Sequence, residues 1–182
     1  MPNNPNNDDT SGHPSAPPLL EPVLSWFAEK PPTGLLGASW GEDAAAVAVK
    51  LGLACERWTL WEGGGGYEAC FDTDHPVDVF GGKALARLFR ADGRLKGLSL
   101  RFLHCGETRD ALTDAVGREF HMTTTEGTPY KVYEDGSAVR LDYDSGDDTC
   151  RLTITGPEFG KAFANYLLGA GLAGLAGGLG PR

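Results

Sequence analysis

Basic residues are scarce in this chain, and long apolar runs are missing. The 182 residues include 16 Lys and Arg against 25 Asp and Glu, a formal net charge of −9. A surface that neutralises many phosphates must be broadly basic, so we expect neither nucleic acid nor an anionic membrane as a partner. No segment reaches the roughly 18 apolar residues that cross a bilayer, and the N-terminus lacks the basic start and apolar core of a signal peptide. We therefore expect a cytoplasmic protein without a membrane span, with an exported form left open.

Motifs that specify a reaction are also missing. The four histidines are scattered, and none stands in a nucleophile pattern such as G-x-S-x-G. The glycines at 63–66 are not followed by the Lys-Ser/Thr of a phosphate-binding loop. We therefore expect no cofactor, and a protein without catalytic activity is the favoured hypothesis.

The two ends of the chain differ in composition from its middle. Residues 1–22 hold six of the 12 prolines and few apolar side chains, which predicts a disordered tail. Residues 169–182 are rich in glycine and predict a flexible C-terminus. Residues 23–168 are enough for a single domain of ordinary size.

Helical and strand patterns alternate through this middle region. Apolar spacing predicts helices over 42–51, 109–120 and 158–168, with Ser39 and Glu42 as a capping box, Gly52 as a stop and Thr108 as a cap. A short helix over 22–30 precedes them. Strand patterns cover residues 55–61, 67–71, 77–80, 84–90, 94–104, 130–133, 138–143 and 149–155. Alternation in 94–104 and 149–155 predicts one apolar and one polar face, with these residues facing inward: Leu98, Leu100, Phe102, Cys150, Leu152 and Ile154. The order predicts an α+β fold with an antiparallel sheet covered by helices, possible halves at 35–105 and 106–156, and a C-terminal helix.

Two hairpins carry predictions about register. Trp58 opposite Tyr67 sets Cys55 opposite Cys70, close enough for a disulfide. In the later hairpin, Asp135-Gly136 matches a two-residue type I′ turn. That turn would pair Val132 with Val139 and Tyr130 with Leu141 on one face of the sheet.

The pattern resembles the tandem helix-plus-hairpin repeats of the beta-lactamase inhibitor protein and of the small outer-membrane assembly lipoproteins. The residues that carry the resemblance are Gly37-Ala38-Ser39-Trp40-Gly41-Glu42, Lys50-Leu51-Gly52, Asp92-Gly93 and Asp135-Gly136, within residues 35–155. It implies a surface that binds other proteins without catalysis. Those proteins are exported, several with a lipid-bearing cysteine, whereas this N-terminal tail has neither signal nor cysteine.

The four cysteines allow three interpretations. Cys55 with Cys70, and Cys105 with Cys150 as a bridge between the halves, would make an exported, disulfide-stabilised domain. Buried free thiols fit equally well. A zinc site of His104 and Cys105, which the other three cysteines could approach, is the third, although adjacent strand residues point to opposite faces and no C-x-x-C pair is present.

Two acidic clusters are candidates for chemistry. Asp72, Asp74 and His75 could serve as acid and base in a small hydrolase or isomerase, although an exposed turn before Pro76 explains them more simply. Four carboxylates that follow one another closely could hold calcium, although the EF-hand order is not met and a solvated acidic turn is simpler. These are Asp142, Asp144, Asp147 and Asp148.

Aromatic residues flank the glycine run at 63–66. Trp58, Trp61 and Tyr67 are of the types that anchor protein interfaces, and alternation places the two tryptophans on opposite faces. Two arrangements fit: one tryptophan in the core and the other exposed, or both in the core. The favoured function is therefore an acidic module that binds another protein through a sheet face or this hairpin.

Overall fold

The computed structural model describes residues 30–122 and 129–177, with side chains up to residue 169. The predicted tail at 1–22 and nearly all of the predicted helix at 22–30 lie outside these ranges. No helix in the described ranges is long and apolar enough to cross a membrane. The strands are β1 (Gly34–Leu35), β2 (Ala38–Ser39), β3 (Thr59–Leu60), β4 (Glu68–Phe71), β5 (Val77–Val79), β6 (Gly82–Ala91), β7 (Arg94–Leu103), β8 (Tyr130–Val132), β9 (Ala138–Asp144) and β10 (Thr149–Thr155), and the helices are α2 (Ala44–Lys50), α3 (Arg109–Phe120) and α4 (Pro157–Gly177).

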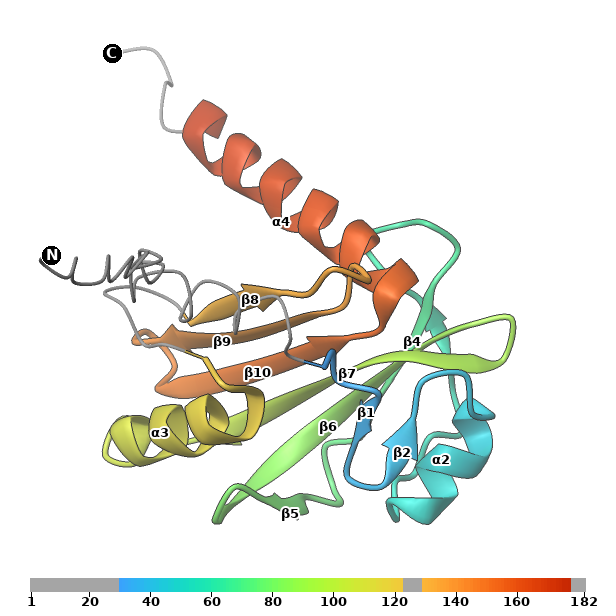
Figure 1. Cartoon of the computed structure of the whole chain (residues 1–182), viewed down its shortest axis with the longest axis horizontal. Helices are drawn as coiled ribbons and strands as arrows, with labels where there is room; N and C mark the ends of the chain where they lie inside the picture. Colours follow the sequence, from blue (N-terminus) through green and yellow to red (C-terminus); the bar gives the residue numbers. More distant parts are fainter. Residues whose placement is uncertain (1–29, 123–128, 178–182) are drawn as a thin grey trace, which may run out of the picture.

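An eight-stranded antiparallel sheet organises this part of the chain (Figure 1). Its strand order is β3-β4-β6-β7-β10-β9-β8, with β5 paired to β6, and β1 and β2 form a small separate hairpin. The helix α2 precedes β3 to β7 and α3 precedes β8 to β10, so two helix-then-strands units meet where β7 pairs with β10. The predicted α+β fold is confirmed.

One side of the sheet, which we call the packed face, builds the main core beneath α2 and α3. It carries Leu88, Leu100 and Leu152, all fully buried, against Val47 of α2 and Val116 of α3. The alternation predicted for β7 and β10 is confirmed, because the inward-facing residues of both strands are buried. These are Leu98, Leu100, Phe102, Cys150, Leu152 and Ile154.

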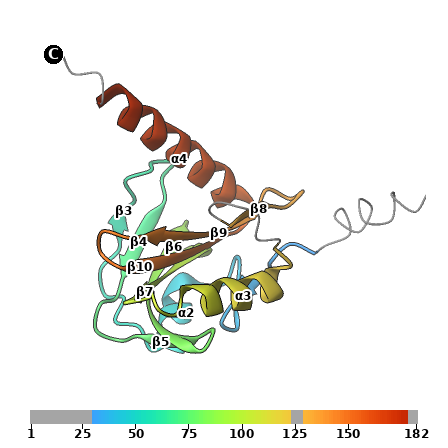
Figure 2. The same cartoon turned by 90° about the vertical axis from the view of Figure 1, so that its left-hand side faces the viewer.

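The helix α4 lies on the opposite side from α2 and α3 (Figure 2). Phe159 at its start is fully buried with Trp61, Ala69 and Phe89 in a second, smaller core. The helix continues to Gly177, beyond the predicted end at residue 168. Alanine and leucine alternate with the glycines of this segment, and these strong helix formers offset the low helix propensity of glycine.

The N-terminal ends of α2 and α3 differ from the predictions. Glu42 does accept a hydrogen bond from the amide of Ser39 at 3.0 Å, but α2 begins at Ala44, and Asp43 is its cap, accepting from the amide of Ala46. Thr108 precedes α3 without a side-chain capping bond, because its hydroxyl donates to the carbonyl of Cys105. Gly52 has the predicted left-handed backbone, with a φ of 70°.

Both predicted hairpin registers are wrong. In the first hairpin Thr59 pairs with Ala69, and Cys55 lies before β3 rather than on a strand. In the second, Lys131 pairs with Val139 and Val132 with Ala138. The turn holds three residues, because Tyr133 pairs with Ser137 and only Gly136 in the turn has a positive φ. A turn one residue longer than predicted shifts every pair by one residue. Tyr130 and Val132 therefore share a face with Arg140 and Ala138 rather than with Leu141 and Val139.

Candidate functional site

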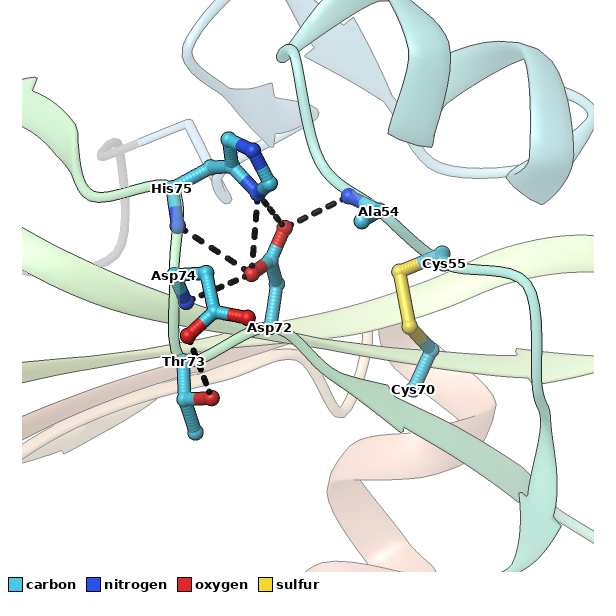
Figure 3. A network of polar contacts seen from close by, with 7 residues as sticks. All are labelled: Ala54, Cys55, Cys70, Asp72, Thr73, Asp74 and His75. Atoms are coloured by element: carbon cyan, nitrogen blue, oxygen red, sulfur yellow. Dashed lines mark hydrogen bonds and ion pairs between the residues drawn. A yellow bond between two sulfur atoms is a disulfide. The ribbon is translucent and has the colours of Figure 1, made fainter.

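The predicted acid-base cluster is a structural hydrogen-bond network (Figure 3). The Asp72 side chain is only 2% exposed. Its carboxylate accepts from the amides of Ala54, Asp74 and His75 and contacts His75 Nδ1 at 2.9 Å. Asp74 and His75 are exposed. Because the oxygens of Asp72 are engaged by four donors, the carboxylate fastens the segment after α2 to the end of β4.

The charge state of Asp72 fits this fastening role. Burial by itself raises the pKa of the carboxyl, but the amides of Ala54, Asp74 and His75 and the ring of His75 together lower the pKa from 3.8 to about 2. A general base that works near neutral pH needs a pKa near the working pH. Asp72 is therefore suited to a permanent negative charge rather than to proton exchange.

The four cysteines form two disulfides, Cys55–Cys70 and Cys105–Cys150. The first lies beside the Asp72 network and ties the same segment to β4 (Figure 3). The second joins the end of the first unit to β10 of the second, and both of its cysteines are buried. The interpretations with free thiols or a zinc-bound Cys105 are excluded in this structure, because all four sulfur atoms are engaged.

Each of the four carboxylates of the second acidic cluster, on β9 and in the turn after it, has a hydrogen-bond partner. The carboxylates of Asp142 and Asp147 bind Arg140 and Arg101, both at 2.7–2.8 Å. Asp144 accepts from the amide of Gly146, and Asp148 accepts from the amide of Gly106. Within the described ranges no group of three or more metal-ligating side chains comes together.

The aromatic residues beside the glycine run are packed rather than exposed. Trp61 is only 4% exposed in the second core, and Tyr67 packs there against Phe159 with ring centroids 4.7 Å apart. Trp58 packs against the main core, with the Arg90 guanidinium stacked on its ring at 4.2 Å. The tryptophans do lie on opposite faces, but the alternative with one of them exposed is wrong, because both pack against a core and α4 covers this end of the sheet.

The glycine run serves this packing. A Cβ atom at position 63 would stand 2.1 Å from the ring of Trp61, and Gly64, Gly65 and Gly66 all have positive φ. The backbone therefore turns tightly over the indole ring, which only glycine permits.

The remaining part of this side of the sheet, which we call the open face, contains a hollow of about 400 Å³. One wall is aromatic and comes from the second core and α4: Trp61, Phe89, Phe163 and Tyr166. The floor is polar and comes from the central strands: Arg87, Ser99, Arg101, Arg151, Thr153 and Asp142. Its volume is in the range of ligand-binding cavities, which bind apolar and polar groups side by side.

Strand register arranges the floor in two rows, one of which continues past the hollow to Arg140 on β9. Arg87, Ser99, Thr153 and Arg140 follow one another across β6, β7, β10 and β9. Leu85, Arg101, Arg151 and Asp142 form the next row on the same strands. Four arginines therefore surround two buried hydroxyls, Ser99 and Thr153, whose oxygens lie 3.2 Å apart.

Most of these arginines have a carboxylate partner. Arg87 binds Glu62, Arg101 binds Asp147 and Arg140 binds Asp142, with oxygen distances of 2.7–2.9 Å. Arg151 is exposed and has no ion pair or hydrogen bond of its side chain with the described residues. The Nε atom of Arg101 is buried and has no hydrogen-bond partner there. The floor thus retains donors that the described chain does not use.

Sequence reasoning missed this floor. The alternation of Ser99 and Arg101 with leucines in β7 indicated a polar face, but the arginines are spread over residues 87–151. They become neighbours only through the strand order and register.

Comparisons with known proteins do not identify a relative. No protein-family model and no curated protein sequence matches this chain. Among solved structures, a cysteine-rich secretory protein from Staphylococcus aureus is similar over 72% of this chain and 50% of that chain, with 12% sequence identity and a TM-score of 0.39. The chain thus spans about half the length of that protein. A similarity this slight carries no argument about fold or function.

Proposed function

We propose that this chain is a disulfide-stabilised, non-catalytic domain that binds a partner protein on the open face of its sheet. The observation that carries the proposal is the hollow of about 400 Å³ between the polar floor and the aromatic wall. The packed face is closed by α2 and α3, whereas the open face is covered by α4 only at one end. A half-covered sheet face with aromatic and arginine side chains has the composition of a protein interface.

The role of the Asp72 carboxylate supports binding over hydrolysis or isomerisation. It is held by four donors in a buried network. In a hydrolase or isomerase that used this cluster, the Asp72 carboxylate would have to contact a substrate. Its burial and its four bonds argue against that role.

The two disulfides support an oxidising compartment as the working place of the domain. Structural disulfides persist in secreted proteins and are rare where thiols are kept reduced. The exported alternative is therefore part of the proposal, in preference to a cytoplasmic location.

Site-specific photo-cross-linking in the native cells tests the proposal. A photoreactive amino acid replaces Phe71, which lines the hollow and is 43% exposed. The matched control replaces Val49, which is 79% exposed on α2. We expect one defined protein adduct from position 71, competed by excess unmodified protein, and none from position 49. Equal adducts from both positions, or none from position 71, contradict the proposal.

A further inference from the structure

The hydrogen-bonding groups of the open-face floor are unbalanced. Three arginines line the floor, Arg87, Arg101 and Arg151, and Arg140 continues one of its rows on β9. Against these four guanidinium groups stand three carboxylates, those of Glu62, Asp142 and Asp147, within a chain of net charge −9. The paired hydroxyls of Ser99 and Thr153 share one hydrogen bond, so one O–H donor remains for another acceptor. The floor therefore offers positive charge and donors, and calls for an acceptor-rich, anionic ligand.

We propose that this floor recognises an acidic segment of a partner protein, whose carboxylates bind the arginines while an adjacent apolar side chain enters the aromatic wall. The inference rests on the proposed binding function and names the chemistry of its partner. Charge complementarity identifies the occupant: arginine binds carboxylates through a planar fork of donors, often two bonds at a time.

The spread of the arginines favours a chain segment over a single small anion. Arg87 on β6 and Arg140 on β9 are separated by three strand spacings, or about 14 Å at roughly 4.8 Å per spacing. A single carboxylate is far too small to contact both. A peptide with several acidic side chains places one carboxylate beside each arginine.

A carboxylate of the ligand can replace the carboxylate that each of two arginines binds within the chain. The carboxylates of Glu62 and Asp147 are 52% and 47% exposed, and ion pairs at such positions contribute little to stability. A ligand carboxylate can therefore replace either one on its arginine. Arg151 has no direct ion pair with the described residues, and its charge acts only from a distance on Glu62 and Asp147, where it helps to lower the pKa of both carboxyls. A ligand carboxylate can therefore bind Arg151 without breaking an existing ion pair.

Two synthetic peptides test the inference with the whole chain. One is a capped octapeptide in which glutamate alternates with leucine or phenylalanine, and the other carries glutamine in place of every glutamate. We expect the glutamate peptide to bind at least tenfold more tightly by fluorescence anisotropy. In NMR spectra it should shift the amide signals of Arg87, Ser99 and Thr153.

Two variants that each remove one positive charge test whether the glutamate peptide binds at the floor. Arg151→Gln should weaken binding of the glutamate peptide at least fivefold. Arg118→Gln removes the same charge from an exposed position on α3 and should change the affinity less than twofold. Equal affinity for the two peptides, equal loss in both variants, or shifts confined to α2 and α3 overturn the inference. If the cross-link from position 71 persists in Arg151→Gln at full yield, the partner binds there by other chemistry, and only this inference fails.

Discussion

The ring of Phe159 on α4 lies directly against the backbone of Gly97 on β7. A Cβ atom at position 97 would stand 2.5 Å from ring carbon Cδ1 of Phe159. The contact seats α4 on the sheet and brings Phe159 to within 5.0 Å of Trp61, measured between ring centroids. Because Gly97 has no side chain, Phe159 can pack close to β7 and support Trp61, which belongs to the aromatic wall of the hollow.

Gly97→Ala should lower the free energy of unfolding by about 2 kcal/mol, within the usual cost of overfilling a packed core. The added methyl group forces either the ring or the start of α4 to move. Urea denaturation measures the loss, and the total tryptophan fluorescence should change because the ring of Trp61 packs against Phe159.

Gly82→Ala is the matched control on the same sheet. A Cβ atom there meets Phe102 at 3.6 Å, an ordinary contact, and Gly82 has no positive φ. We expect a change within about 0.5 kcal/mol, because the methyl group fits and restricts the unfolded chain. Equal losses at positions 97 and 82 would show that the contact with Phe159 is not what position 97 requires.

Gly136→Ala should cost more than Gly93→Ala. Both glycines end tight turns with positive φ, so alanine costs about 1 kcal/mol at either position. At position 136 the Cβ atom would also stand 3.0 Å from the carbonyl oxygen of Pro157, whereas at position 93 it would meet nothing within 4 Å. We expect an additional loss of about 1 kcal/mol at position 136, measured by thermal or urea unfolding. A larger loss at position 93 would contradict this explanation.

Turn length explains why the sequence predicted the elements but not their pairing. Periodicity was sufficient for α3 and for the inward-facing residues of β10, because burial on one face imposes a repeat that can be counted. The turn between β8 and β9 contains Glu134 as well as Asp135 and Gly136. Both turn lengths suit Asp-Gly, so the local sequence does not choose between them. In the fold Gly136 lies close to Pro157 at the start of α4, a contact distant in sequence that a local pattern does not contain.

The candidate site depends on the same long-range information. The disulfide partners Cys55 and Cys70 were predicted from a strand register that the structure does not have. They meet because the segment after α2 is fastened beside β4 by Asp72. The open-face floor could not be predicted, because Arg87, Arg101, Arg140 and Arg151 meet only once β7 pairs with β10 across the two units.

Removing the disulfides should destabilise the domain unequally. Their cysteines are 15 and 45 residues apart. In the chain-entropy account the cost is about 3 kcal/mol for the shorter loop and about 4 kcal/mol for the longer one. Cys105→Ala with Cys150→Ala should therefore lose about 1 kcal/mol more than Cys55→Ala with Cys70→Ala, measured by urea denaturation without reductant. The reverse order would mean that contacts around Cys55 outweigh loop closure.

The stability of the domain should fall in acid through Asp72. The pKa of this carboxyl is about 2 in the folded chain, below its ordinary value of 3.8. A lowered folded pKa contributes stability that is fully present above the unfolded pKa and is lost as the pH falls through the folded pKa. The shift corresponds to about 1 to 2 kcal/mol once solvent screening is allowed for, present above about pH 5 and lost between about pH 4 and pH 2.

Asp72→Asn tests this assignment, because it removes the charge and turns one acceptor into a donor facing the amides of Ala54 and Asp74. The variant should lose more stability relative to the natural chain at pH 7 than at pH 2.5, in urea titrations at each pH. Asp78→Asn is the control, since its carboxylate is 80% exposed beside Lys83 and should change stability little at either pH. If the loss from Asp72→Asn is the same at both pH values, the charge of Asp72 does not stabilise the fold, and only the shape of its side chain holds the segment after α2 in place.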